Sequence, residues 1–210
     1  MKRNLVIVFI GLLFTQFCRT QSFQGTIQYR VVCEVKEKTM SEFEMQSSLG
    51  NFQSYQFRGS DMLMTNNGKI LIWQWYKADE SRIYQKTGGQ DKITYLPASR
   101  ITDEIQKVIP LKKEKMILGK RCKGIQLHKY SGTFTYYYTA DYAINPEIFK
   151  NLIFENWNQL FALIKAVPLQ MIMENEQFKV VMTATQVRKG KTNDLDFQLP
   201  EPQFIEASPF

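Results

Sequence analysis

The sequence of 210 residues has few cysteines and one histidine, and this scarcity limits the chemistry that it can support. Its cysteines, Cys18, Cys33 and Cys122, form no Cys-x-x-Cys pair. Structural zinc sites take four ligands, mostly cysteine and histidine, so we expect neither a metal nor a cofactor. His128 lies six residues after Cys122, which is about 20 Å along an extended strand, too far for a catalytic dyad. We therefore expect a protein that is not an enzyme.

Long apolar runs and a strong excess of one charge are also missing. The run Leu5–Phe14 is much shorter than the about 20 residues of a membrane-spanning helix. Because Lys2 and Arg3 precede it, it predicts a secretory signal peptide over residues 1–20 and one domain over residues 21–210. An uncleaved anchor and a lipid on Cys18 are the alternatives. Cleavage would lower the net charge from +7 to +4, which gives no reason to expect nucleic-acid binding.

What the sequence does have is a strong β-strand pattern. In GTIQYRVVCEVK, residues 25–36, apolar side chains alternate with polar ones, as in a half-buried antiparallel strand. Residues 38–48 and 52–59 are predicted as the next strands. Turn residues such as Asn66–Gly68 and Ser131-Gly132 predict hairpins between further strands. A short helix is expected at Ala98–Ile109.

The main helix is predicted to begin at Asn145-Pro146-Glu147, which has the residue types of a helix N-terminus. Its apolar stripe comprises Phe149, Leu152, Ile153, Trp157, Leu160, Phe161 and Ile164. About ten strands and one such helix predict a mainly β (α+β) fold. We expect a strongly curved, open antiparallel sheet, an incomplete barrel, with this helix over its concave face.

A helix over a concave sheet can enclose an apolar cavity. The candidate lining residues are Trp73, Trp75, Phe149, Trp157 and Phe161, although these aromatic side chains could instead simply pack the core. Methionine side chains adapt to irregular apolar ligands or irregular gaps. Five occur in predicted strands: Met62, Met64, Met171, Met173 and Met182.

Five segments occur in the order of a known family: GTIQYRV, KMILGKRCKGIQL, YYYTAD, INPEIF followed by VPLQMIM, and DFQLPEP. Together they resemble a cell-envelope family of unassigned function from the Bacteroidetes, over residues Phe23 to Pro200. That family is related in architecture to LolA- and LolB-type lipoprotein carriers. The resemblance implies a LolA-like open sheet with helices over its concave face, and a periplasmic or outer-membrane location. Carrier-type relatives bind acyl chains in the concavity.

We therefore expect a secreted or periplasmic monomer that binds a lipid or acyl chain, with peripheral membrane contact as an option. The alternatives are an interaction module for another envelope protein, and a hydrolase whose carboxylates meet in a cleft. The basic segment LKKEKMILGKRCK, residues 111–123, is either a solvated face or a patch for phosphates or lipid headgroups. In an oxidising compartment Cys33 and Cys122 could form a disulfide. However, strand alternation places Cys33 on an apolar face and Cys122 with His128 on a polar one.

Overall fold

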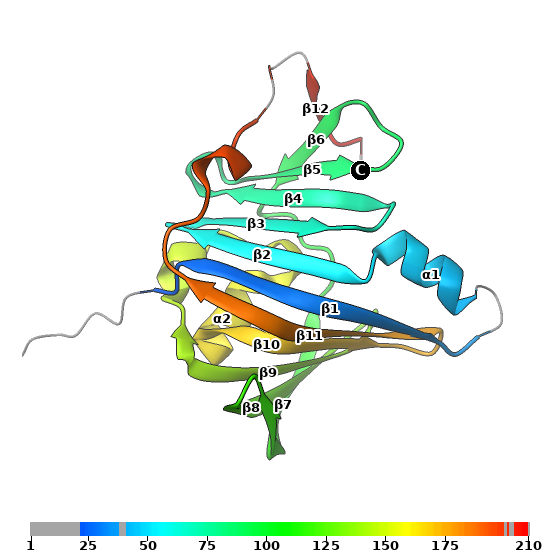
Figure 1. The fold of residues 1–210 in the computed structure, drawn as a ribbon, viewed down its shortest axis with the longest axis vertical. Helices are drawn as coiled ribbons and strands as arrows, with labels where there is room; N and C mark the ends of the chain where they lie inside the picture. Colours follow the sequence, from blue (N-terminus) through cyan, green and yellow to red (C-terminus); the bar gives the residue numbers. More distant parts are fainter. Residues whose placement is uncertain (1–21, 38–40, 200, 202–203, 210) are drawn as a thin grey trace, which may run out of the picture.

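The computed structural model describes residues 22–37, 41–199, 201 and 204–209, and they form a mainly β protein (Figure 1). The predicted signal peptide lies outside the described residues. In chain order the elements are β1 (Gly25–Val35), α1 (Glu42–Leu49), β2 (Phe52–Arg58), β3 (Asp61–Asn66), β4 (Leu71–Lys77), η1 (Ala78–Glu80), β5 (Arg82–Thr87), β6 (Ile93–Pro97), β7 (Ile105–Ile117), β8 (Lys120–Lys129), β9 (Gly132–Ala143), η2 (Pro146–Phe149), η3 (Phe154–Asn156), α2 (Trp157–Ile164), β10 (Ala166–Glu174), β11 (Phe178–Lys189), η4 (Asp194–Asp196) and β12 (Ile205–Ala207), where η marks a 3₁₀-helix. Within these ranges no helix has the length and apolarity needed to cross a membrane.

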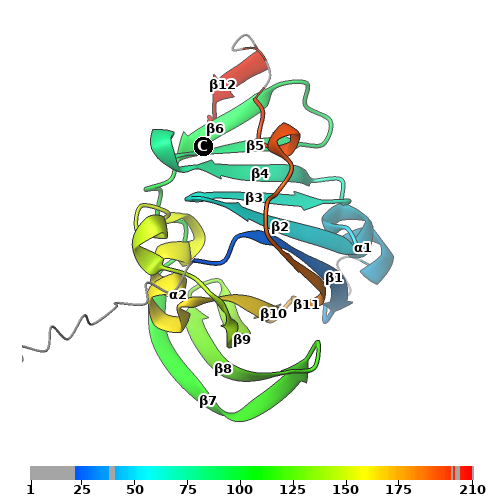
Figure 2. The same cartoon turned by 60° about the vertical axis from the view of Figure 1, so that its left-hand side comes forward.

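The twelve strands of the described chain form one open sheet in the order β12-β6-β5-β4-β3-β2-β1-β11-β10-β9-β8-β7. From β1 the chain passes outward through β2 to β6, crosses to the opposite edge, and returns inward from β7 to β11. Neighbouring strands are antiparallel, except that β12 runs parallel to β6. The sheet curves around α2 (Figure 2). The predicted open, curved sheet with one main helix on its concave face is confirmed.

Strand β1 shows why the sheet has a concave core. Ile27, Tyr29 and Val31 are at most 4% exposed, whereas the alternating Arg30 and Val32 face solvent. Successive side chains of a strand point to opposite faces, so this alternation places one row of β1 toward α2. The Tyr29 hydroxyl donates a hydrogen bond of 2.6 Å to the carbonyl of Pro168, and this satisfies its only buried polar atom.

The segment predicted as one long helix is instead broken into η2, η3 and α2. Asn145 caps its start as predicted, since its side chain accepts a hydrogen bond from the backbone of Glu147. Glu155 and Asn156, however, have φ angles of 55° and 63°, which a right-handed helix cannot contain. The apolar stripe predicted the buried face of this segment correctly but could not show the break.

Two other predictions of local structure are wrong. Residues 42–49 form the helix α1 and no strand, because Ser41 and Glu44 make a capping box, in which each side chain bonds to the other residue's backbone N–H. Residues 98–104 contain no helix; they cross the concave side, and β7 begins at Ile105. The amide groups of Ile153 and Phe154 both donate to the carbonyl of Ala98 at 2.9 Å, and this holds the crossing segment against the broken helix.

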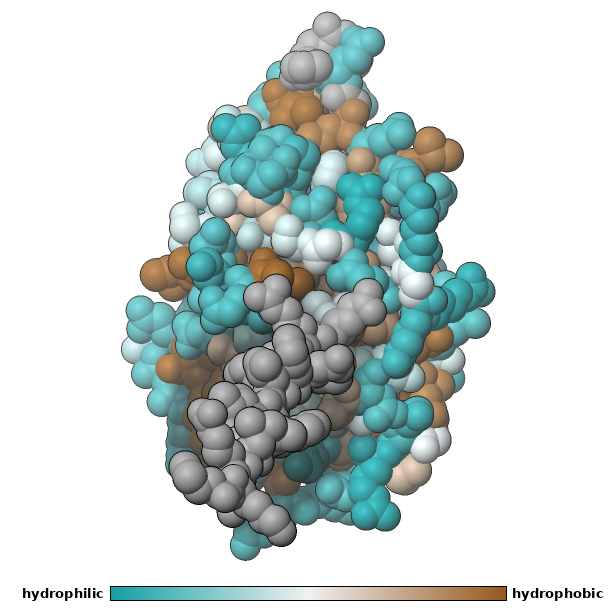
Figure 3. All heavy atoms as spheres, turned by 90° about the vertical axis from the view of Figure 1, so that its left-hand side faces the viewer, coloured by the Kyte–Doolittle hydropathy of each residue, from teal (hydrophilic) through white to brown (hydrophobic). Residues whose placement is uncertain are grey.

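The centre of the core is an aromatic cluster between the sheet and α2. Phe57, Phe149 and Phe161 are each at most 1% exposed. Their ring centroids lie 6.0 Å (Phe57–Phe149), 6.3 Å (Phe57–Phe161) and 5.0 Å (Phe149–Phe161) apart. Burying a side chain of this kind stabilises the fold by about 1.5–3 kcal/mol. On the face shown in Figure 3, by contrast, hydrophobic side chains form small separate patches among hydrophilic ones.

The proposed disulfide between Cys33 and Cys122 is not formed; both thiols are free and buried. Three strands lie between β1 and β8, so four spacings of about 4.8 Å place the two strands on the order of 19 Å apart along the sheet. A disulfide needs Cα atoms within about 7 Å. Cys122 is also fully buried in the main core, which corrects its predicted place on a polar face. Pairing of β7 with β8 is irregular beside it, between Leu111 and Lys115.

Candidate functional site

A solvent-open cavity of about 470 Å³ lies on the concave face, bounded by the end of α1 on one side and by η3 and the start of α2 on the other. Its lining comprises Val31, Ser48, Leu49, Gln53, Tyr55, Met64, Asn66, Ile70, Leu71, Gln74, Thr102, Asp103, Lys129, Ser131, Phe134, Tyr136, Glu155, Trp157, Met171, Ile172, Met173, Val180 and Met182. Pockets that bind small molecules typically measure 300–1,000 Å³, so this cavity has the size of a ligand site.

Strand register creates the apolar wall of the cavity. Tyr136, Met171, Met182 and Val31 are successive cross-strand partners on β9, β10, β11 and β1, so their side chains form one row on the concave face. Met173 and Met64 extend this wall. Four of the five methionines noted in the sequence therefore line the cavity. Because methionine is unbranched and flexible, this wall can adapt to apolar ligands of irregular shape.

The opposite part of the lining is polar and comes from three separate loops or strand ends. Asp103 lies on the crossing segment before β7, Lys129 ends β8, and Glu155 lies in η3. Asp103 accepts hydrogen bonds from the backbone amides of Tyr130 and Ser131 at 3.2 and 3.3 Å. The Lys129 ammonium donates to the Glu155 carbonyl at 3.3 Å. We refer to Asp103, Lys129 and Glu155 as the polar end of the cavity.

Glu155 is held in an unfavourable backbone conformation. Left-handed φ angles cost roughly 1–2 kcal/mol per non-glycine residue, and Glu155 and Asn156 both adopt them. Hydrogen bonds to the crossing segment fix this conformation: the Glu155 amide donates to Thr102 Oγ1 at 3.3 Å, and the Asn156 side chain donates to the Asp103 carbonyl at 2.7 Å. Strained backbone of this kind is concentrated at functional sites, which supports a role for the carboxylate that it presents.

The polar end is only partly withdrawn from solvent, since Asp103 and Lys129 are half-buried and Glu155 is exposed as a residue. Burial raises the pKa of the Glu155 carboxyl, although Lys129 and the Trp157 side chain partly offset this. Burial likewise lowers the pKa of Lys129. Among the described residues Lys129 forms no ion pair within 4.0 Å; its ammonium lies 4.3 Å from the Phe134 ring centroid. A half-buried ammonium without a close carboxylate partner gains from pairing with a polar or charged group, so the polar end is suited to a ligand with such atoms.

The structure brings only one of the five predicted lining residues to the cavity. Trp157 lines it, whereas Phe149 and Phe161 are fully buried in the core behind it. Trp73 and Trp75 point to the opposite, convex face, where Trp75 packs with Leu63 and Phe197 and Trp73 lies against this cluster. All four predictions are therefore corrected. The tryptophans miss the cavity because alternation along β4 gives the concave face to Gln74 and Tyr76, and the phenylalanines miss it because they pack against the core.

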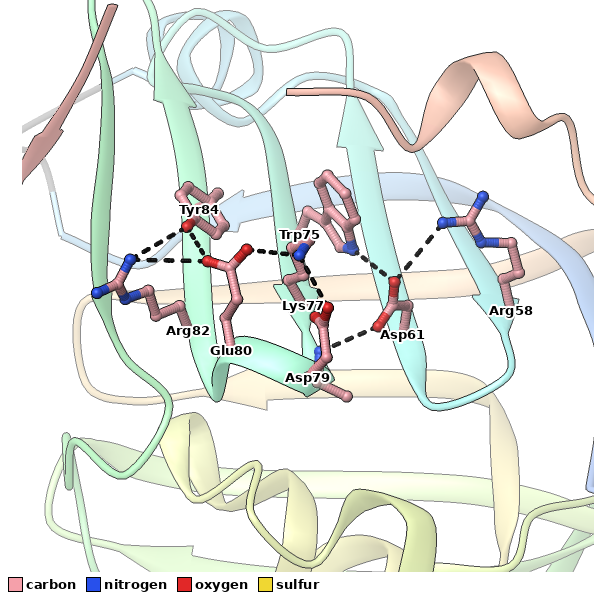
Figure 4. Close-up of polar contacts among 9 residues, drawn as sticks. Arg58, Asp61, Trp75, Lys77, Asp79, Glu80, Arg82 and Tyr84 are labelled. Carbon is pink, nitrogen blue, oxygen red and sulfur yellow. Dashed lines mark hydrogen bonds and ion pairs between the residues drawn. The ribbon is translucent and has the colours of Figure 1, made fainter. Parts of the chain in front are cut away.

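The convex face carries its own polar network (Figure 4). Asp61 accepts hydrogen bonds from the Trp75 indole at 3.3 Å and from the Ala78 amide at 3.0 Å. Lys77 contacts Asp79 at 3.0 Å and Glu80 at 2.5 Å. Hydrogen bonds from Lys77 lower the pKa of both acids. This network is internally satisfied and joins η1 to β3 and β4.

The C-terminal segment is attached beside this network. The Arg58 guanidinium lies 3.9 Å from the Phe197 ring centroid and 3.6 Å from Asp194. Both contacts hold the segment after β11 over the tryptophans of β4. The convex tryptophans therefore have a structural role, since they are covered by the chain's own C-terminal residues.

Sequence reasoning missed the polar end completely. Asp103, Lys129 and Glu155 are far apart in the sequence, and none belongs to a recognisable motif. Lys129 is a charged residue at a strand end beside a turn, which is normally a solvated position. The left-handed φ of Glu155 has no sequence signal, because glycine, the usual residue there, is absent.

Comparison with known proteins gives distant structural likenesses alone. No family model and no curated protein matches the sequence. Two crystal forms of PNGF-II, P21 and C2, share 15% identity with this chain and cover 88% of it, with TM-scores of 0.47 and 0.49. The chain spans 31% of the PNGF-II chain, about a third of its length. LprF from Mycobacterium bovis shares 10% identity over 78% of this chain and 85% of its own, with a TM-score of 0.33. Function is therefore inferred from the cavity.

Proposed function

We propose that this protein is a secreted or periplasmic binding protein that holds one amphipathic lipid or acyl chain in the concave cavity. The apolar chain of the ligand lies along Met171, Met173 and Met182, and its polar head lies at Lys129 and Glu155. The observation that carries the proposal is the combination, in one open cavity of about 470 Å³, of a methionine-rich wall and a polar end with charged side chains. The sequence resemblance to an envelope family related in architecture to LolA- and LolB-type carriers supports the same ligand class.

Two physical features favour ligand binding over packing. A wall of flexible methionines loses van der Waals contacts where it faces an unfilled space, and an apolar chain restores them. A polar head at the other end can contact the Lys129 ammonium, which forms no ion pair with the described residues, and the Glu155 carboxyl, which lines the same cavity. Both contributions favour a ligand that is apolar at one end and polar at the other.

The proposal is tested with the protein purified without its predicted signal peptide. Lipid extraction followed by mass spectrometry should identify a bound acyl-chain compound, and a fluorescent fatty acid should bind with one molecule per chain. Met182→Trp should fill the cavity and weaken binding at least tenfold. Leu195→Trp is the control, because Leu195 is 70% exposed and lies outside the cavity; it should bind as the wild type does. Equal binding by both variants would contradict the proposal.

A hydrolase is the second candidate, because one observation favours it. Asp103 and Glu155 line the same cavity, and burial raises the pKa of Glu155, as expected for a catalytic acid. Asp103, however, already accepts hydrogen bonds from Tyr130 and Ser131, which occupy the atoms that a second catalytic carboxylate would use. Turnover of acyl esters or glycosides that is lost in Glu155→Gln would favour this candidate.

A further inference from the structure

The β7–β8 hairpin carries most of the chain's net charge on one edge of the sheet. Residues 107–123 contain seven lysines or arginines and one acid, Glu114, while the whole chain has a net charge of +7. The hairpin forms the lower edge of the sheet in Figures 1 and 2, and it lies away from β4 and the C-terminal segment that covers its tryptophans. Such a concentration of charge at one edge produces a local positive field that the overall composition does not show.

Part of this charge is neutralised within the protein and part is not. Arg121 pairs with Glu114 at 3.5 Å, and Lys120 pairs with Asp141 at 2.6 Å. Lys115 donates to the Gln170 side chain at 2.7 Å. Within the described part of the chain, the remaining four form no ion pair: Lys107, Lys112, Lys113 and Lys123. These four ammonium groups are available to an anionic partner.

The tip of the hairpin is apolar and exposed. Met116 is 64% exposed and Leu118 is 43% exposed. Met116 lies near the end of β7 and Leu118 lies in the turn, where Leu118 and Gly119 have φ angles of 49° and 70°. Ile117 between them is 5% exposed and packs in the core, so the turn leaves Met116 and Leu118 exposed at the end of the hairpin. Basic residues behind an apolar tip are the combination found in segments that lie in the interface of a membrane.

We propose that the β7–β8 hairpin docks the protein on an anionic lipid surface. The free lysines contact headgroup phosphates, while Met116 and Leu118 enter the boundary between headgroups and acyl chains. An aliphatic tip favours lipid over nucleic acid, because phosphates and base edges offer no apolar partner for it. Strand addition by another protein is disfavoured, because Pro110 has no amide hydrogen to donate and lysines along an edge strand oppose pairing.

The test is co-sedimentation with vesicles, using the chain without its predicted signal peptide. Vesicles of phosphatidylcholine containing about 30% phosphatidylglycerol should bind the protein, and vesicles of pure phosphatidylcholine should bind it much less. Each basic residue near an anionic surface changes partitioning by roughly fivefold, so Lys112→Gln with Lys113→Gln should weaken binding by about 25-fold. The matched control is Lys69→Gln with Lys150→Gln, which removes the same charge from exposed positions elsewhere.

A second variant tests the apolar tip separately. Met116→Ser with Leu118→Asn keeps every charge, and asparagine tolerates the left-handed φ of position 118. It should abolish the part of the binding that survives high salt, while the electrostatic part at low salt remains. Equal losses from the two lysine pairs would overturn the proposal, because binding would then depend on net charge alone. Displacement of the vesicles by an oligonucleotide at equal phosphate concentration would also overturn it.

Discussion

The two faces of the sheet hold charged side chains in opposite ways. On the convex face, Lys77 lies 3.0 Å from Asp79 and 2.5 Å from Glu80, and these contacts lower the pKa of both acids. On the concave face, burial dominates at Glu155 and raises the pKa of its carboxyl. Acidic residues therefore stabilise the convex face through their pairs with Lys77, whereas the ionised form of Glu155 on the concave face is disfavoured.

This difference favours the concave face as the site of the proposed ligand. A protein that violates a local rule of stability usually does so at a functional site. At the polar end, Glu155 has a strained backbone and a carboxyl whose pKa is raised. The convex network also borders a left-handed residue, Ser81 with a φ of 51°, but its carboxylates are paired and their pKa values are lowered, so its role is structural. If this comparison is correct, substitutions in the core, the polar end and the convex network should change the stability of the protein by different amounts, with different signs and with different pH dependence.

The largest expected effect comes from the aromatic core beneath the cavity. Phe161→Ala removes a side chain that is 0% exposed, so we expect the free energy of unfolding to fall by about 3–5 kcal/mol. Denaturant unfolding measures this directly. Leu163→Ala on the same helix is the control, because Leu163 is 45% exposed; it should change stability by less than about 1 kcal/mol. Similar losses from both variants would show that α2 is not packed as described.

The core is also what the sequence predicted best. Alternation in residues 25–36 and the stripe from Phe149 to Ile164 depend on which side chains are buried, and burial is set by periodicity. These two patterns therefore predicted the curved sheet and the helix on its concave face. The methionines of the wall followed from the same reasoning, since they lie within strands.

The cavity's polar end could not be predicted in this way. It depends on the crossing segment before β7, on the turn after Lys129 and on the break at Glu155, which tertiary contacts fix and no sequence pattern marks. Trp73 and Trp75 show a related limit. Both faces of β4 are apolar in the sequence, so alternation could not decide which face lies over the cavity, and the C-terminal segment that covers Trp75 is distant in the chain.

The second prediction concerns Glu155. The pKa of its carboxyl is raised above the usual 4.5 in the folded protein. At a pH between the unfolded-state pKa and the raised folded-state pKa, the folded state therefore binds more protons than the unfolded state. Stability contributed by this group is therefore lost as pH rises through that interval. We expect Glu155→Gln to raise the melting temperature at about pH 8 relative to wild type, and the gain to disappear toward about pH 4.

Thermal unfolding across this pH range, followed by circular dichroism, gives the measurement. Glu147→Gln removes an exposed carboxylate near the start of the same segment and controls for the loss of one charge. A Glu155→Gln variant that is less stable than wild type at neutral pH would contradict the comparison. It would place Glu155 with the convex network, as a carboxylate that stabilises the fold.

The smallest expected effect is on the convex face, and its pH dependence has the opposite sign. Lys77→Gln removes an exposed pair with Asp79 and Glu80, so it should cost less than about 1 kcal/mol at neutral pH. Lys77 lowers the pKa of Glu80 in the folded protein. The stability that this pair contributes is therefore present above the usual carboxyl pKa, and it is lost as the pH falls through the lowered folded-state pKa. About 1 M salt should also screen it. In one pH scan, acidification should therefore remove the loss caused by Lys77→Gln and the gain caused by Glu155→Gln. Changes of the same sign in both variants at neutral pH would mean that the two faces hold their charges in the same way.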